Sequence, residues 1–365
     1  MAPVPSTSSQ SLYDPRRHVR VDAERARDVS STDFPGYWPN EDHSWNLAKF
    51  QEGLQVKVTR LSKRSIEFDL VGVDASIANA FRRILIAEVP SICIEHVYVW
   101  NNTSVMVDEV FAHRLGLVPL NVDPSLMSSR EDDNDQPTDR NTLVFHLQVT
   151  CERNKNAPKT ATDPAEVYIN SEVLSSHLKW VPQGEQEIVF ADNPPAPTNP
   201  NIVLMKLRPG QEVDMEMHAV KSVGKDHAKF CPVATASYRL LPLIVLNPKK
   251  PVPPHLAEKF RKCFSPGVIE VDPITKAVSI NEEQMRKETM SREVLRHPEF
   301  EGCVELKRVR DYFLFHIESE GAYTPERLLP ESIKVMREKI ATIRKAAEAL
   351  RSDSGGSGDV EMRDS

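Results

Sequence analysis

A chain of 365 residues has room for one large domain or two ordinary ones, and for a sizeable buried core. Hydrophobic residues make up 40% and charged residues 27%, close to the globular average, which excludes disorder of the whole chain. The 46 Lys and Arg residues are outnumbered by 53 Asp and Glu residues, and the net charge is -7. No global basic field exists, which argues against a protein that grips nucleic acid through phosphates alone.

The cysteines are scattered along the chain, and no two of them form a C-x-x-C pair. They are Cys93, Cys151, Cys231, Cys263 and Cys303. This spacing favours neither a disulfide framework nor a zinc knuckle, so we expect no bound metal and no cofactor. The first residues contain no apolar signal region, and we expect a reduced, intracellular and soluble protein.

The first folded elements are expected after residue 50, because residues 1–50 carry little periodicity and suggest an arm that orders against a partner. Apolar residues then alternate with polar ones in two short runs, at 54–58 and at 66–70. This pattern predicts a hairpin of two half-buried strands.

The period then changes to that of a helix over residues 76–88, which Pro90 ends. Four apolar side chains share one face of this helix and are expected at a partner interface, namely Ile77, Phe81, Ile84 and Leu85. For Ile77 and Leu85, ordinary core packing is the alternative. The neighbouring Arg82 and Arg83 suit bidentate contact with a carboxylate on another chain. The alternative is one exposed arginine and one that lies along the apolar surface.

Further strands are predicted at 143–149, 213–219 and 312–317, and a long helix at 325–350. Strands and helices do not alternate one for one, which favours an α+β fold. Apolar residues of the last helix recur at spacings of three and four, as in an a/d heptad pattern. They are Ile333, Met336, Ile340, Ile343, Ala347 and Leu350.

This apolar stripe runs for about 27 Å at 1.5 Å per residue, longer than a single small sheet is expected to cover. We therefore expect a two-chain seam, with one end of the stripe packed on the chain's own sheet. Pro330 is expected to cause a restart or a kink. Residues 352–365 are expected to be a flexible tail.

Candidate catalytic groups are few. Glu109 and His113 lie four residues apart on a short predicted helix and suit a metal or proton-transfer pair, but a helix ion pair behind an N-cap at Asp108 explains them better. Gly224-Lys225 lacks the other residues of a phosphate loop and is better read as a turn. The enzyme hypothesis is therefore weak, and we expect no active site.

Four segments in order resemble the alpha subunit family of DNA-directed RNA polymerases. They are Asn79–Ser91 (NAFRRILIAEVPS), Asp108–Leu120 (DEVFAHRLGLVPL), Gly224–Tyr238 (GKDHAKFCPVATASY) and Phe315–Gly321 (FHIESEG) followed by Pro325. The combination looks most like the branch shared by polymerases I and III. The polymerase II branch carries a cysteine-rich zinc loop, and several archaeal relatives carry iron–sulfur cysteines, which this chain lacks.

The resemblance implies a dimerisation module, an antiparallel sheet with helices on one side, interrupted by a mostly-β inserted domain. Its halves would be residues 51–93 and 304–351, and the insert 94–303, with the return point left open between 236 and 303. The module would pair with a small alpha-like subunit. Arg82 and Arg83 would lie towards the second-largest, catalytic subunit, and small core subunits would be further partners.

The implied function is a non-catalytic platform on which the large subunits assemble, in the nucleus including the nucleolus. Nucleic acid would be met only through the complex, and no membrane is implied. Two alternatives stay open, the corresponding subunit of polymerase II and a stand-alone metal-dependent enzyme built on Glu109 and His113.

Overall fold

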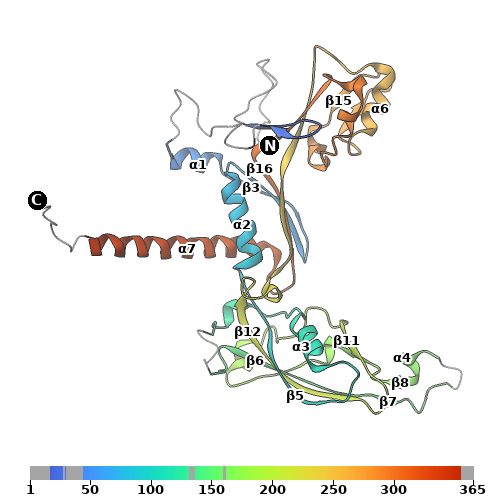
Figure 1. Ribbon diagram of the computed structural model, residues 1–365, viewed down its shortest axis with the longest axis vertical. Coiled ribbons are helices and arrows are strands. Elements are labelled where there is room, and N and C mark those ends of the chain that lie inside the picture. The colour runs from blue at the N-terminus through green and yellow to red at the C-terminus, as the bar shows by residue number, and fades with distance from the viewer. Residues whose placement is uncertain (1–16, 28, 30–43, 131–135, 159–161, 355–365) are drawn as a thin grey trace, which may run out of the picture. The chain divides into compact units, whose positions relative to one another are not determined.

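The computed structural model of the protein describes residues 17–27, 29, 44–130, 136–158 and 162–354 (Figure 1). These residues form two compact units. The first unit contains the described residues up to Arg60 together with Glu67–Asn79 and Ser237–His316. The second unit contains Leu61–Ile66, Ala80–Ala236 and the described residues from Ile317 onward.

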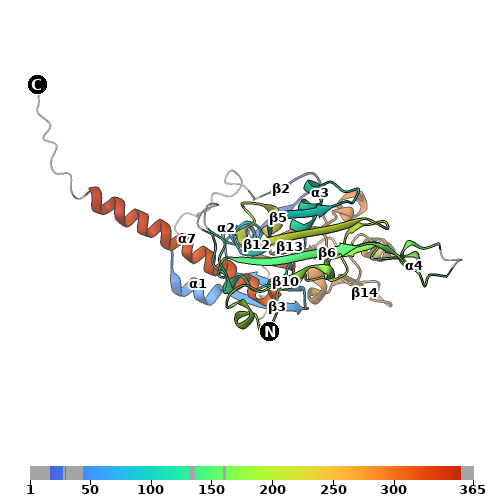
Figure 2. The same ribbon diagram turned by 90° about the horizontal axis from the view of Figure 1, so that it is seen from below.

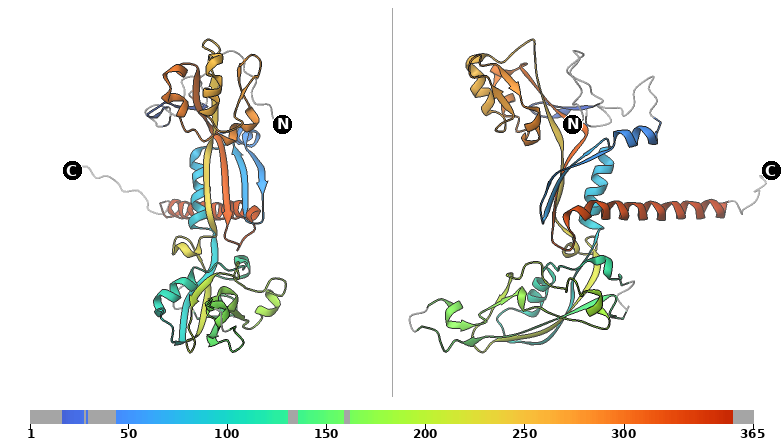
Figure 3. Two further views of the ribbon diagram at one scale, coloured as in Figure 1. Left: turned by 90° about the vertical axis from the view of Figure 1, so that its right-hand side faces the viewer. Right: turned by 180° about the vertical axis from the view of Figure 1, so that it is seen from behind.

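A six-stranded sheet lies mainly in the first unit, and Figure 3 shows its long strands side by side. The strand order is β2-β1-β16-β4-β3, and β13 also pairs with β16. The strands are β1 (His18–Val21), β2 (Ala26–Arg27), β3 (Gln55–Leu61), β4 (Ser65–Val71), β13 (Val233–Leu246) and β16 (Val304–Ser319). A short helix, α1 (Leu47–Gly53), precedes β3.

Part of the expected N-terminal arm belongs to this sheet. β1 pairs antiparallel with β16, with His18 opposite Val309 and Val21 opposite Leu306. Val19 and Val21 are buried. The expectation that this part orders only against a partner is therefore wrong, because it completes the chain's own sheet. The aromatic residues at 34–39 lie outside the described residues.

The predicted hairpin is present as β3 and β4, and the predicted helix as α2 (Ala75–Ala87). Asp74 begins α2, because its Oδ2 accepts a hydrogen bond from the Ser76 N–H at 2.8 Å. Hydrogen bonds from the side chain and the backbone of Ser76 lower the pKa of the Asp74 carboxyl. The charged carboxylate is thus kept where it favours the helix dipole.

Residues 247–303 pack in the first unit. They contain α6 (Ala257–Lys262) and the paired strands β14 (Ile269–Val271) and β15 (Val278–Ile280). Phe260, Phe264 and Phe300 form a core cluster with residues of the six-stranded sheet, among them Val21 and Leu306. An apolar core therefore joins this segment to the sheet.

The second unit is built on a four-stranded sheet of order β10-β6-β12-β5 (Figure 2). Its strands are β5 (Pro90–Asn102), β6 (Thr142–Thr150), β10 (Lys179–Val181) and β12 (Glu212–Val223). Two further strand pairs are β7 (Glu152–Arg153) with β8 (Tyr168–Ile169), and β9 (Glu172–Leu174) with β11 (Val203–Lys206). The helices are α3 (Asp108–Gly116), α4 (Pro164–Val167), α5 (Gln186–Val189) and α7 (Pro325–Ser354).

The strand pairing shows a change of sheet just before the range 236–303 in which the sequence placed the return point. β12 pairs with β5 and β6, whereas β13 pairs with β16. The chain thus leaves the four-stranded sheet between Val223 and Val233. Residues 237–303 group with the first unit rather than with the four-stranded sheet. Alternating apolar residues predict a strand at β12 and at β13 alike. The sequence alone therefore did not show that these two strands belong to different sheets.

Candidate partner interface

The first turns of α7 pack against other segments of the second unit. Tyr323, just before the helix, is buried, and its hydroxyl donates a hydrogen bond to the Pro90 carbonyl at 3.0 Å. Arg327 forms an ion pair with Asp123, with Nη1 2.6 Å from Oδ2. Leu328 has no exposed surface. These contacts fix where the helix starts.

No restart occurs at Pro330, because α7 is one continuous helix from Pro325 to Ser354 (Figure 1). Pro325 lies at the first position, where a missing N–H costs nothing. Pro330 lies in the second turn and removes only one backbone hydrogen bond. Ser332 Oγ donates to the Leu329 carbonyl at 2.7 Å in the same turn.

The remainder of α7 carries the predicted apolar stripe on an uncovered surface. Every residue from Arg337 to Arg351 is exposed. The exposed fraction is 41% for Ile333, 56% for Ile340, 68% for Ile343 and 71% for Leu350. Ala347 is also exposed, and Met336 is half-buried. A contiguous aliphatic stripe in water is typical of a surface that another chain covers.

Helix α2 is more buried than the sequence indicated. Ile84 and Leu85 are buried in the chain's own fold, at 4% and 0% exposure, and are therefore not available to a partner. Ile77 and Phe81 are half-buried. The helical period identified the apolar face correctly, but it does not tell how much of that face the same chain covers.

The two arginines of α2 differ in exposure, because Arg82 is half-buried and Arg83 is exposed. A surface ion pair joins the end of α2 to α7, with Lys339 Nζ 2.7 Å from Glu88 Oε1. Both side chains are partly exposed, so this pair contributes less than about 1 kcal/mol.

Strand β3 presents apolar residues that sequence reasoning did not assign to an interface. Leu54, Val56 and Val58 are exposed, at 37%, 51% and 58%, which contradicts the prediction of a half-buried strand. β3 is at the edge of the six-stranded sheet. The alternation was the available signal, but it does not show whether a helix of the same chain covers the strand.

Polar side chains tie β3 to β4 and to the segment at 247–303. Arg286 Nη2 lies 3.2 Å from Thr59 Oγ1, and Arg286 Nη1 lies 2.7 Å from both Asp69 oxygens. Arg60 Nη1 lies 3.7 Å from Glu67 Oε1. On β4, Phe68 stacks on Phe315, with ring centroids 5.0 Å apart. The polar contacts of β3 are thus made within the chain, while its valines stay exposed.

A sequence model of the RNA polymerase Rpb3/Rpb11 dimerisation domain matches residues 67–340. The chain belongs to this family. The match includes α2 and the first half of α7, which carry the helical part of the candidate interface. The α+β fold is the one that the order of strands and helices in the sequence predicted, and it agrees with the matched domain.

The chain is similar along its length to named members of the Rpb3/Rpb11 family. It is 48% identical over 324 residues to the DNA-directed RNA polymerases I and III subunit RPAC1 of Saccharomyces cerevisiae, covering 88% of this chain and 96% of that one. It is 44% identical over 346 residues to RPAC1 of Mus musculus, covering 95% and 99%. The RNA polymerase II subunit rpb3 of Dictyostelium discoideum is 31% identical over 298 residues, covering 80% and 93%.

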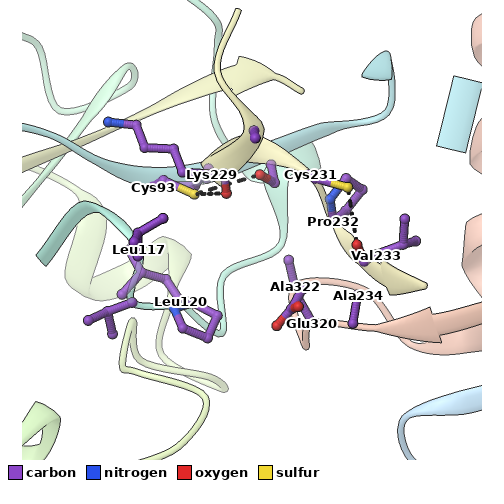
Figure 4. A pocket seen from close by; sticks show the side chains of 15 residues that line it. Cys93, Leu117, Leu120, Lys229, Cys231, Pro232, Val233, Ala234, Glu320 and Ala322 are labelled. Atoms are coloured by element: carbon purple, nitrogen blue, oxygen red, sulfur yellow. Dashed lines mark hydrogen bonds between the residues drawn. The ribbon is translucent and has the colours of Figure 1, made fainter. Parts of the chain in front are cut away.

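The second unit of this Rpb3/Rpb11-family chain contains a cavity of about 220 Å³, which Figure 4 shows from close by. Two of its lining thiols donate to carbonyl groups, Cys93 to that of Lys229 at 3.0 Å and Cys231 to that of Val233 at 3.1 Å. Burial raises the pKa of Cys93 to about 11 and also raises the pKa of Cys231. Both thiols are protonated at neutral pH, so the cavity offers no thiolate nucleophile.

The sequence-derived pair Glu109 and His113 lies on α3, and both side chains are exposed. Val107 rather than Asp108 precedes the helix as its N-cap, and the Asp108 carboxylate accepts a hydrogen bond from Asn102 Nδ2 at 2.6 Å. Among the residues that the structure describes, no three His, Cys, Asp or Glu side chains gather in a group that could hold a metal ion.

Gly224-Lys225 lies in a turn that packs on the end of α2. The Lys225 N–H donates to the Ala87 carbonyl at 2.8 Å. A Cβ at position 224 would lie 2.3 Å from the Ile86 carbonyl oxygen, so only glycine allows this approach. The glycine is explained by packing, without a phosphate. In the described part of the chain, we find no helix with the length and apolar character needed to cross a membrane.

Proposed function

We propose that this chain is a non-catalytic assembly subunit of nuclear RNA polymerases I and III. In this role it pairs with a small alpha-like subunit, and the pair forms the platform on which the large catalytic subunits assemble for rRNA, tRNA and other small RNA synthesis. One observation carries the choice of polymerase. The RPAC1 relatives named for polymerases I and III are 36–48% identical over 96–99% of their length, whereas the polymerase II subunit is 31% identical over 93% of its length.

The pairing is supported by the surface of α7. Ile333, Ile340, Ile343 and Leu350 keep 41–71% of their surface exposed. Fully burying an aliphatic side chain contributes about 1.5–3 kcal/mol, so covering what remains exposed here contributes about 1 kcal/mol each. The four side chains of the α7 stripe together contribute too little free energy for a stable complex, because association also has an entropic cost. The exposed residues of β3 and the half-buried Ile77 and Phe81 of α2 would supply the rest of the interface.

The further contacts follow the same proposal. Arg83 is exposed and Arg82 is half-buried, and both would face the second-largest subunit, where a guanidinium suits a carboxylate. Small core subunits would complete the contacts. The chain would meet nucleic acid only through the complex, and its location would be the nucleus, including the nucleolus.

The test is to tag the chain in its own cells, purify it natively, and identify the largest co-purifying subunits by mass spectrometry. The proposal predicts the largest subunits of polymerases I and III, with one small alpha-like subunit common to both. A tagged polymerase II counterpart is the matched control. Recovery of the polymerase II subunits instead would favour the alternative, and recovery of no polymerase subunit would contradict an assembly role.

A further inference from the structure

The exposed half of α7 has a charge pattern that is tied to its apolar stripe. If Ile333, Ile340 and Ala347 occupy heptad position a, then Met336, Ile343 and Leu350 occupy position d. Position e then holds arginine in each heptad, at Arg337, Arg344 and Arg351. Position g holds Lys339 and Ala346. Both borders of the stripe are thus free of acidic residues between Ile333 and Arg351.

This basic border is a local feature. Between Ile333 and Arg351 the helix carries six cations and two anions, whereas the whole chain has a net charge of -7. The acidic residues of this segment, Glu338 and Glu348, lie at heptad positions f and b, away from the stripe. In two-helix seams, the residues at e and g select the partner and its orientation.

We propose that the stripe is covered by an amphipathic helix of a second protein that carries acidic residues along the flank facing Arg337, Arg344 and Arg351. This inference rests on the proposed function, which supplies a partner subunit, and it states the chemistry of that partner. The partner helix is expected to carry aliphatic residues at its own a and d positions, with Asp or Glu spaced seven residues apart beside them.

A second copy of this chain does not fit the same surface. In a parallel pair, Lys339 at position g would face Arg344 at position e of the other copy. In an antiparallel pair, the arginine row would face itself. Like charges oppose each other in both orientations, so the pattern selects against self-association as well as for an acidic partner.

The ion pair that Arg344 forms within this chain is weak enough to be replaced by a contact with a partner. Arg344 pairs with Glu348 one turn away, with Nε 2.9 Å from Oε1 and side-chain exposures of 78% and 60%. Such an exposed pair contributes only about 0.3–0.5 kcal/mol. An acidic side chain across a seam that excludes water offers a stronger contact, because the effective dielectric constant is lower there.

The test compares two double charge reversals on the same helix. Arg337→Glu with Arg344→Glu changes the border of the stripe. Lys334→Glu with Lys345→Glu changes positions b and f, which face away from it. Each double variant replaces two cations by two anions, and each places a new carboxylate four residues from an existing one, at Glu348 or at Glu338. Helix propensity and net charge are therefore matched.

The measurement is the dissociation constant of each full-length variant for the small alpha-like subunit of the same organism, at about 0.05 M and about 1 M salt. We expect the border variant to bind about tenfold more weakly than the wild type at low salt, with the difference shrinking at high salt. The control variant should bind like the wild type. Light scattering of the wild-type chain alone should give a monomer.

Equal binding by both double variants, or equal loss of binding in both, overturns the inference while the proposed function stands. A wild-type homodimer that the border variant abolishes would overturn it too. Failure of the wild type itself to bind the small subunit would overturn the proposed function, and with it the inference.

Discussion

Arg327 in the first turn of α7 lies between an acidic and an aromatic side chain. Its Nη1 is 2.6 Å from Asp123 Oδ2, and its guanidinium carbon lies 5.4 Å from the centroid of the Tyr323 ring. Asp123 follows α3 in the chain, so this contact ties the start of α7 to a segment of the second unit far away in sequence. The position of the exposed stripe depends on it.

The Asp123–Arg327 pair should make stability depend on pH. Burial raises the pKa of Asp123, but hydrogen bonds from Arg327 and Ser125 outweigh it, and the pKa of Asp123 is lowered. A carboxyl with a lowered pKa stabilises the folded state above its unfolded pKa, and this contribution is lost as pH falls through the folded pKa. We expect Asp123→Asn to cost about 1 kcal/mol at about pH 6, and this cost to shrink as the pH falls below the unfolded aspartate pKa of about 3.9. Urea unfolding across this range measures it, and a difference that is independent of pH would contradict the assignment.

Tyr312 should stabilise the first unit through a buried carboxylate. Asp69 is 3% exposed and accepts hydrogen bonds from Tyr312 at 2.8 Å and from Arg286 at 2.7 Å. Because a hydrogen bond to a charged group contributes about 1.5–3 kcal/mol, Tyr312→Phe should lower the free energy of unfolding by about that amount. Tyr98→Phe, on an exposed strand position, is the control. Equal unfolding midpoints for the two variants would contradict the prediction.

The same tyrosine gives a second readout at high pH. Burial, followed by the hydrogen bond and the charge of Asp69, raises the pKa of Tyr312 to about 12. Because the folded state holds this proton more tightly, the stabilisation is complete below the ordinary tyrosine pKa of about 10 and is lost as pH rises from there through the folded pKa. The stability difference between wild type and Tyr312→Phe should therefore shrink above about pH 10.

Local patterns in the sequence predicted which elements form. The helical period and Pro90 predicted a helix at 76–88, and α2 spans Ala75–Ala87. The a/d spacing predicted the stripe on α7, whose outer part is exposed. In both cases the signal is local, since a period of 3.6 residues or a proline acts within a few residues of its own position.

The sequence did not show which apolar residues are buried by distant segments of the same chain. Ile84 and Leu85 are buried while Val56 and Val58 are exposed, although all four belong to clear apolar patterns. β1 pairs with β16, although Val21 and Leu306 lie far apart in the sequence. A local apolar period cannot predict a pairing between such distant segments. Packing between distant segments decides burial, and one sequence alone carries no signal for such contacts.

The uncovered valines of β3 should matter for association and not for folding. Val56→Lys with Val58→Lys replaces exposed side chains, so the unfolding midpoint should stay within about 0.5 kcal/mol of the wild type. Binding to the small alpha-like subunit should weaken by about tenfold or more, because two apolar contacts are lost. The matched control is Val56→Thr with Val58→Thr, which keeps strand propensity and should weaken binding less. Wild-type affinity of the lysine variant would place the partner elsewhere.

The isolated chain should hold no structural metal. The cysteines form no C-x-x-C pair, and four ligands must converge to close a zinc site. Elemental analysis of the purified chain should find neither zinc nor iron near one equivalent. Near-stoichiometric metal that resists dialysis would refute this expectation, and would reopen the hypothesis of a metal-dependent enzyme.

The central claim, that the exposed stripe of α7 is covered by a partner subunit, is tested most directly by co-expression with the small alpha-like subunit. Ile340→Asp with Ile343→Asp places two charges on side chains that are 56% and 68% exposed, so the chain itself should fold normally. Ala341→Asp with Ala349→Asp adds the same charges off the stripe, and truncation after Gly358 removes only residues beyond α7. We expect the stripe variant to lose its partner on co-purification while both controls keep it. Recovery of the stripe variant with its partner at wild-type yield would contradict the account.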